Sequence, residues 1–179
     1  MMFDLVKTRR SIRKYLEKEV EKEKIDVIIK SALMAPSSRR RRPWEFIVVT
    51  DREKLKELSS CREHSAKFLE GAPLGIVVIA DSAKSDVWVC DASIASTIIQ
   101  LTAHSLDLGS CWIQVHKRFD EEGISAEENV RKALGIPEKY SVLCVIAIGY
   151  PDESKKPYEE ENLPYEKVHY ERYDKEDAE

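Results

Sequence analysis

The segment from about Val87 to Leu106 constrains the fold most, because apolar and small residues cover more than one face of the helix that it predicts. A helix that is apolar most of the way round must be buried on most of its sides. The chain has 179 residues, which suits one domain with a proper core. In a protein this small, we expect a central helix that a partner chain covers in part.

The rest of the chain predicts further helices and a buried sheet. Apolar residues spaced i, i+3, i+4 over residues 25–33 predict an amphipathic helix, which Pro36 ends. A short helix is expected after Asp51, and Ser125 with Glu128 matches a capping box for another. Four apolar runs predict strands, at residues 44–50, 75–80, 111–115 and 141–150. These elements together indicate an α/β or α+β fold.

Two runs carry more specific expectations. The strand at residues 44–50 is apolar on both sides, so we expect it to be buried. The run at residues 168–173 alternates weakly and predicts an edge strand, added in cis or donated to a partner. Residues 152–179 hold 11 acidic against 5 basic side chains, whereas residues 1–50 hold 13 basic against 7 acidic ones. This tail is therefore either solvated or packed near the basic half of another subunit.

Composition limits the class of protein. With 42% apolar and 35% charged residues, the chain is expected to be soluble and globular. It has no apolar run near the roughly 20 residues of a membrane helix and no apolar signal core, so we expect a cytoplasmic protein. The four cysteines and four histidines are scattered, which favours buried, reduced thiols and disfavours a disulfide scaffold or a metal site.

Two clusters of arginine predict anion binding. Arg39–Arg42 lie in a loop stiffened by Pro36 and Pro43, in a protein whose net charge is −4. Near the N-terminus, residues 9–13 combine three arginines with the Ser11 hydroxyl, and arginine can hold a phosphate bidentately. A solvated basic turn is the alternative for this second cluster. Because the chain has neither G-x-G-x-x-G nor a P-loop, arginines would have to bind any phosphate.

Four sequence blocks together resemble the FMN-dependent nitroreductase family. They are R-R-S-I-R-K-Y at residues 9–15, A-P-S-S-x-x-x-x-P-W-x-F-I-V-V at 35–49, L-G-S-C-W-I at 108–113, and L-G-I-P-E at 134–138 followed by I-G-Y-P at 148–151. The resemblance implies an α+β fold, a three-layer α/β/α sandwich with a mostly antiparallel central sheet. It also implies one FMN-binding domain over residues 1–179 and an intertwined homodimer, in which an arm from about residue 152 to 179 reaches the partner subunit.

The resemblance implies a ping-pong reaction. NADH or NADPH reduces FMN and leaves, and a nitroaromatic, quinone or related acceptor then takes the electrons. Flavin-fragmenting or reductively dehalogenating members of the fold are an alternative, although the short segment at residues 61–73 disfavours the lid they usually carry. A non-catalytic protein that binds flavin or nucleic acid through Arg39–Arg42 is another, disfavoured by the net charge and the lack of interleaved aromatic residues. We therefore expect a second subunit and a small-molecule acceptor as partners, with no nucleic acid and no membrane.

The family motifs imply a set of cofactor-binding residues: Arg9, Arg10, Ser11, Arg13, Pro36, Ser37, Ser38, Arg40, Gln114, Val115, Lys155 and Lys156. The N-terminal arginines would grip the phosphate and the N1–C2=O edge of the flavin, and residues 114–115 would approach N5 through their backbone. Residues 36–38 would lie along the flavin of the other subunit, and residues 155–156 near the phosphate, a looser match because Glu159–Glu161 follow. No side chain is needed as a general acid or base, since FMN carries the chemistry.

Arg40 and Arg42 depart from the family pattern. The usual loop has Asn at the first position and often Gln at the second. An arginine in place of that Asn could bind the flavin ring, reach the phosphate or turn toward an anionic substrate.

Overall fold

The computed structural model of the protein describes residues 1–64 and 66–173. Its middle layer is a four-stranded sheet in the order β1-β2-β4-β3, formed by β1 (Trp44–Val49), β2 (Leu74–Asp81), β3 (Gly109–Gln114) and β4 (Tyr140–Gly149). Every neighbouring pair in this sheet is antiparallel. The central strands β2 and β4 are buried along almost their whole length, because helices cover both faces of the sheet.

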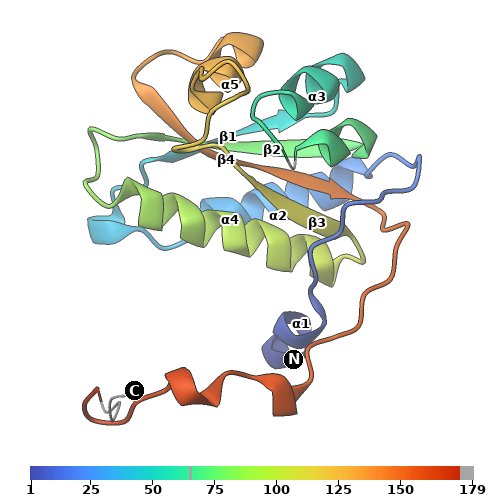
Figure 1. The fold of residues 1–179 in the computed structure, drawn as a ribbon, viewed down its shortest axis with the longest axis vertical. Helices are drawn as coiled ribbons and strands as arrows, with labels where there is room; N and C mark the ends of the chain where they lie inside the picture. The colour runs from blue at the N-terminus through green and yellow to red at the C-terminus, as the bar shows by residue number, and fades with distance from the viewer. Residues whose placement is uncertain (65, 174–179) are drawn as a thin grey trace.

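Two helices cover each face (Figure 1). One face carries α2 (Lys22–Leu33) and α4 (Trp88–Ser105), and the other carries α3 (Arg52–Ser59) and α5 (Ala126–Leu134). Successive side chains of a strand point to opposite faces, so Ile76 joins the core under α2 and α4 while Val77 joins the core under α3 and α5. The predicted three-layer α+β sandwich with an antiparallel sheet is confirmed.

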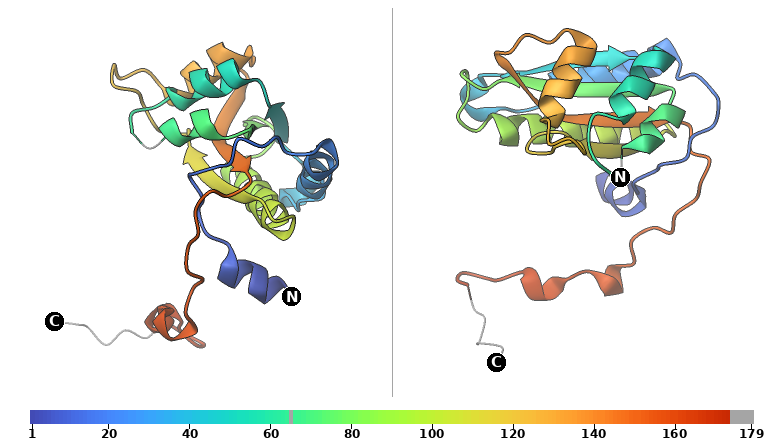
Figure 2. Two further views of the ribbon diagram at one scale, coloured as in Figure 1. Left: turned by 90° about the vertical axis from the view of Figure 1, so that its right-hand side faces the viewer. Right: turned by 45° about the horizontal axis from the view of Figure 1, so that its top comes forward.

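The N-terminal helix α1 (Met2–Thr8) and the C-terminal arm (residues 152–173 as described) lie outside this sandwich. They run side by side away from the sheet (Figures 1 and 2). The Tyr158 N–H donates to the Lys7 carbonyl at 2.9 Å, and Lys7 Nζ lies 2.8 Å from Glu160 Oε1. No residue of α1 or of the described arm is buried. In the described part of the chain, no helix is long and apolar enough to cross a membrane.

The central helix α4 is exposed on one side. Its buried residues pack against α2 and the sheet, as expected for a helix with apolar residues on several faces. Val89 and Ile94 are nevertheless 37% and 41% exposed. The single chain therefore covers α4 only in part.

Several expectations fail in detail. The β1 strand is not buried on both sides, because it forms an edge of the sheet and exposes Glu45 and Val48. Cys61, Cys111 and Cys144 are buried thiols, but Cys90 is exposed on α4. Helix α5 begins after Ser125 as predicted, yet the Ser125 side chain forms no capping hydrogen bond.

The predicted strand at residues 168–173 does not form in cis. The described arm contains only two short 3-10 turns, Glu160–Asn162 and Tyr165–Lys167, and then an exposed irregular segment. A strand needs a neighbour to satisfy its backbone groups, and the arm lies away from its own sheet. Donation to a partner remains a prediction, and residues 174–179 of the predicted arm lie outside the described residues.

Candidate functional site

The N-terminal arginines lie on a segment that packs against the start of β3. The Ile12 N–H donates to the Ser110 carbonyl at 3.0 Å, and Ser11 and Ser110 form a parallel bridge. On its other side, the Leu16 N–H donates to the Tyr150 carbonyl at 2.9 Å. The segment is thus held between β3 and the chain that leaves β4, which brings residues 9–16 and 150–156 together.

Gly109 permits this close approach. A Cβ atom added to Gly109 would lie 2.7 Å from Ile12 Cβ, well inside van der Waals contact. Ile12 is buried and hydrogen-bonded to the neighbouring Ser110, so it has little room to move. Glycine at the first residue of β3 therefore fixes the distance between the sheet and the arginines.

We expect Gly109→Ala to lower the free energy of unfolding by about 1–3 kcal/mol, the usual range for overpacking a core. The shift of Ile12 should also displace the arginine segment and weaken anion binding. Urea denaturation and titration with phosphate or FMN measure the two effects. Gly71→Ala is the matched control, because a Cβ there meets no atom within 4 Å. Equal stability and equal ligand affinity in both variants would contradict the role given to Gly109.

The cationic side chains converge on one point of the sheet. Burial raises the pKa of the Cys111 thiol, whereas Arg13, a hydrogen bond with Ser11, Lys155 and Arg9 lower it. Arg9, Ser11 and Arg13 alternate along the extended segment and therefore share one side of it, and Glu153 Oε1 links Lys155 to the Arg13 backbone. We call Arg9, Ser11, Arg13 and Lys155 the arginine pocket.

Contacts with the C-terminal segment hold the arginine pocket in place. The backbone N–H of Arg13 donates to Glu153 Oε1 at 2.5 Å, and Lys155 Nζ lies 3.6 Å from the same oxygen. The Arg13 guanidinium carbon lies 5.7 Å from the centre of the Phe68 ring. Backbone and side chain of Arg13 thus have separate partners, and no carboxylate neutralises its guanidinium in the described residues.

Arg10 and Lys156, both predicted to bind the cofactor, contact each other in the structure. The Arg10 Nη1 donates to the Lys156 carbonyl, and the guanidinium lies 4.8 Å from the centre of the Tyr158 ring. Arg10 also lines a cavity of about 320 Å³ with Thr8, Ile12, His104 and Lys155. The structure therefore uses Arg10 to tie the arm to the N-terminal segment, while Lys156 contributes its carbonyl.

The loop at residues 36–38 lies at the opposite end of α4. The Ser38 N–H donates to Asp91 Oδ1 at 2.7 Å in the first turn of α4. Thr8 Oγ1, next to the arginine pocket, lies 2.8 Å from His104 Nε2 in the last turn. Because Asp91 and His104 are 13 residues apart on α4, these two contacts lie about 20 Å apart along the helix. One chain therefore does not bring Pro36, Ser37, Ser38 and Arg40 to its own arginine pocket.

The predicted residues Gln114 and Val115 end β3. The Gln114 side chain accepts from Trp112 Nε1 at 2.9 Å and donates to the His116 carbonyl at 3.0 Å. The Val115 side chain is fully buried. With both side chains engaged, a ligand would meet this segment through its backbone, about 13 Å along the strand from Ser110, although the Val115 N–H already donates to the Leu143 carbonyl at 3.1 Å.

Sequence reasoning missed Arg62. Its Nη1 donates to the Gln114 carbonyl at 3.1 Å. Arg62 follows α3, far from β3 in sequence, and only the fold brings the two together. A single arginine among 29 basic residues carries no signal of its own.

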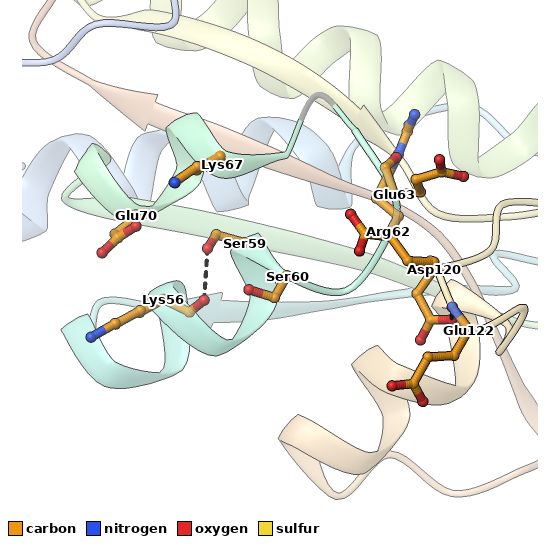
Figure 3. Close-up of a pocket in the computed structure, with 10 residues that line it drawn as sticks. Lys56, Ser59, Ser60, Arg62, Glu63, Lys67, Glu70, Asp120 and Glu122 are labelled. Atoms are coloured by element: carbon orange, nitrogen blue, oxygen red, sulfur yellow. Dashed lines mark hydrogen bonds between the residues drawn. The ribbon is translucent and has the colours of Figure 1, made fainter.

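Arg62 also lines a cavity of about 500 Å³ between the 3-10 helix Lys67–Gly71 and the loop before α5 (Figure 3). Its charges are mixed, with three basic and five acidic side chains: Lys56, Arg62, Lys67, Glu63, Glu70, Asp120, Glu121 and Glu122. A hydrogen bond from Asn129, above all, lowers the pKa of Asp120, and Ser59 donates back to the Lys56 carbonyl at 2.7 Å. Acidic side chains outnumber basic ones in this cavity, which disfavours a phosphate, so the arginine pocket and the edge of β3 form the better candidate site.

The chain is similar to known proteins along nearly its whole length. The family model described as "Nitroreductase family" matches residues 6–61 and 58–150. A protein of Archaeoglobus fulgidus named "Putative NADH dehydrogenase/NAD(P)H nitroreductase" is 40% identical over 94% of this chain and 97% of its own length. A protein of the same name from Methanothermobacter thermautotrophicus is 38% identical over 96% of this chain and 87% of its own.

A solved structure is similar along nearly the whole chain. It is titled an FMN-dependent nitroreductase from Clostridium difficile R20291, with a TM-score of 0.94 and 56% identity, and the match covers 96% of this chain and 99% of that one. Its similarity agrees with the four blocks of sequence and with the three-layer fold. The chain belongs to the nitroreductase family.

Proposed function

We propose that this protein is a homodimeric FMN-dependent oxidoreductase that uses NAD(P)H to reduce nitroaromatic, quinone or related acceptors by a ping-pong mechanism. Family membership supports the FMN and NAD(P)H chemistry. The observation that carries the proposal for this chain is the placement of Arg9, Ser11 and Arg13 along the extended segment that packs on β3, with Lys155 linked to it through Glu153. Because that chemistry draws on NAD(P)H, we place the enzyme in the cytoplasm.

The residues present fit FMN. Its phosphate is a dianion, and the arginine pocket offers three cations and a hydroxyl at the start of β3. Beyond Ser110, the outer side of β3 has no neighbouring strand in the described residues, so its backbone is available to a flat ring. When bound, FMN accepts a hydride equivalent from NAD(P)H and passes the electrons to the acceptor. Fixed cations near the ring stabilise the negative charge that reduction adds and so favour reduction.

A second subunit completes the site in this proposal. The loop at residues 36–38 lies about 20 Å from the arginine pocket of its own chain, along α4. A two-fold partner that packs on the exposed side of α4 would bring its loop to the pocket. The free edge of β1 is then available to residues 168–173 of the partner's arm. We accordingly propose one FMN-binding domain whose arm, from about residue 152, reaches across.

Absorbance and size test the proposal together. We expect the purified protein to be yellow, with a flavin band near about 450 nm that NADH or NADPH bleaches in the absence of oxygen. Light scattering after size exclusion should give twice the chain mass of 20.6 kDa. A colourless protein that takes up no added FMN would refute the enzyme assignment, and a flavin-loaded monomer would refute the shared site.

A further inference from the structure

We propose that Arg39, Arg40 and Arg42 form a binding site for an oxyanion, a carboxylate or a phosphate, on a reactant that docks at the flavin. The inference rests on the proposed function for the position of the flavin. It goes beyond it by assigning a substrate class to this member of the family. We call these three residues the arginine triplet.

The arginine triplet has no counter-charge. Among the residues that the structure describes, none of its three side chains forms a hydrogen bond or an ion pair. Arg41, in the same turn, differs: its Nη1 donates to the Lys84 carbonyl at 3.1 Å and lies 3.5 Å from Asp86. Three exposed like charges within four residues repel one another, and a bound anion relieves that repulsion.

The backbone of the turn does not favour arginine. Arg39, Arg40 and Arg42 have φ values of 50°, 56° and 45°, in the left-handed region. A side chain with a Cβ disfavours this region, whereas Asn and Gly accept it more readily. Strained residues of this kind persist where the surroundings hold them, and they concentrate at ligand-binding sites. The backbone conformation therefore does not explain why arginine occupies these positions. We attribute the choice of arginine to its cationic side chain.

Buried contacts hold the turn rigid. Asp91, only 2% exposed, accepts the Ser38 N–H at 2.7 Å and the Ser85 hydroxyl at 2.9 Å. The Ser37 hydroxyl accepts the Arg42 N–H at 2.9 Å. The backbone that carries the triplet is thus ordered before any ligand arrives, which lowers the entropic cost of binding.

The cofactor does not need this second set of cations. FMN has one phosphate, and the arginine pocket at the other end of α4 already provides cations for it. The triplet is consequently left for the anion of a reactant. In a ping-pong reaction, donor and acceptor occupy the same site beside the flavin in turn. The anion bound by the triplet can therefore be a carboxylate of the acceptor or a phosphate of the donor.

The test uses the flavin-loaded enzyme with all three triplet residues changed, R39N/R40N/R42N. Asparagine suits the left-handed backbone, so we expect the thermal midpoint of the variant to equal or exceed that of the wild type. Arg41→Asn is the matched control, since it removes one charge from the same turn but from a guanidinium that is already engaged. The rate constants of both variants are expressed per bound flavin before they are compared with the wild type.

The first measurement isolates the acceptor. Photoreduced enzyme is mixed with 4-nitrobenzoate or with the uncharged 4-nitrobenzamide, and the rate constants for flavin reoxidation are compared. We expect the carboxylate-to-amide ratio to fall about tenfold or more in the triple variant and less than about twofold in Arg41→Asn. In the wild type, the ratio should also fall as salt rises from about 0.02 to about 0.5 M.

The second measurement isolates the donor. Oxidised enzyme is reduced with NADH or with NADPH, which carries one more phosphate, and the NADPH-to-NADH ratio is compared between the same proteins. The dissociation constant of benzoate, from the shift it causes in the flavin spectrum, gives a binding readout without turnover. A fall in the acceptor ratio assigns the triplet to a carboxylate, a fall in the donor ratio assigns it to a phosphate, and either supports the site.

Unchanged ratios in both half-reactions, with unchanged benzoate affinity, overturn the inference and leave the proposed function intact. Loss of flavin from the triple variant also overturns it, because the triplet then serves the cofactor. So does a random oligonucleotide that the wild type retains at low salt and the triple variant releases. A wild-type protein without flavin would refute the proposed function itself.

Discussion

Arg13→Ala is expected to purify with little FMN and to bind added FMN at least about 100-fold more weakly, since hydrogen bonds to charged groups contribute about 1.5–3 kcal/mol each and about 2.8 kcal/mol is 100-fold. The guanidinium of Arg13 has no carboxylate partner in the described residues, so the phosphate would be its principal one. The Arg13 backbone is held separately by Glu153, so the substitution removes the cation and leaves the segment in place. The ratio of flavin to protein and a fluorescence titration measure the loss.

Two further substitutions test whether the loss of FMN affinity is specific to the guanidinium of Arg13. Arg13→Lys should recover part of the affinity, because lysine keeps the charge but cannot bind bidentately. Arg52→Ala removes an exposed arginine at the start of α3 and should leave FMN affinity within about twofold of the wild type. Undiminished flavin in Arg13→Ala would remove that residue from the phosphate site.

Deletion of residues 157–179 is expected to convert the dimer to a flavin-free monomer. No residue of the arm that the structure describes is buried in its own chain, yet the arm carries large apolar side chains such as Leu163, Val168 and Tyr170. Each such side chain contributes roughly 1.5–3 kcal/mol when it is buried. If several of these side chains lose their burial in both subunits, the free energy lost is a large part of the 5–15 kcal/mol that typically stabilises a folded domain. Sedimentation velocity and thermal unfolding measure the two consequences.

A matched control separates the arm's apolar contacts from its charges. Lys7→Ala breaks the exposed ion pair with Glu160, which should leave the thermal midpoint nearly unchanged and the dimer intact, because exposed ion pairs contribute little to stability. If the truncated chain remained a flavin-loaded dimer, the proposed exchange of arms would be wrong. If Lys7→Ala alone separated the subunits, the charges would matter more than the apolar residues.

Periodicity predicted the elements well, because burial leaves a pattern in the sequence. The helix expected over residues 25–33 is α2, the one expected from Val87 to Leu106 is α4, and the four strands predicted between residues 44 and 150 lie within a few residues of their places. The order of the strands leaves no such pattern. An apolar run does not distinguish an edge from the centre of a sheet, which is why the exposure of β1 was missed.

For the site, the family motifs identified residues but not their partners. Arg9, Ser11, Arg13 and Lys155 do converge, although Lys155 matched the motif only loosely. Arg10 lies between these residues in the motif, but its side chain contacts Lys156 and Tyr158 instead. The reason is that successive side chains on an extended segment point in opposite directions. Arg62 has no motif, and its contact with Gln114 depends wholly on tertiary structure.

In the proposed dimer, the separation of the loop at residues 36–38 from the arginine pocket along α4 has a genetic consequence. A chain with Arg13→Ala and a chain with a damaged loop at residues 36–38 would each be inactive as homodimers. In a mixed two-fold dimer, one site receives both damaged halves and the other receives both intact halves. Two defective alleles of the gene would therefore complement each other within one cell, and half of the sites in each mixed dimer would work.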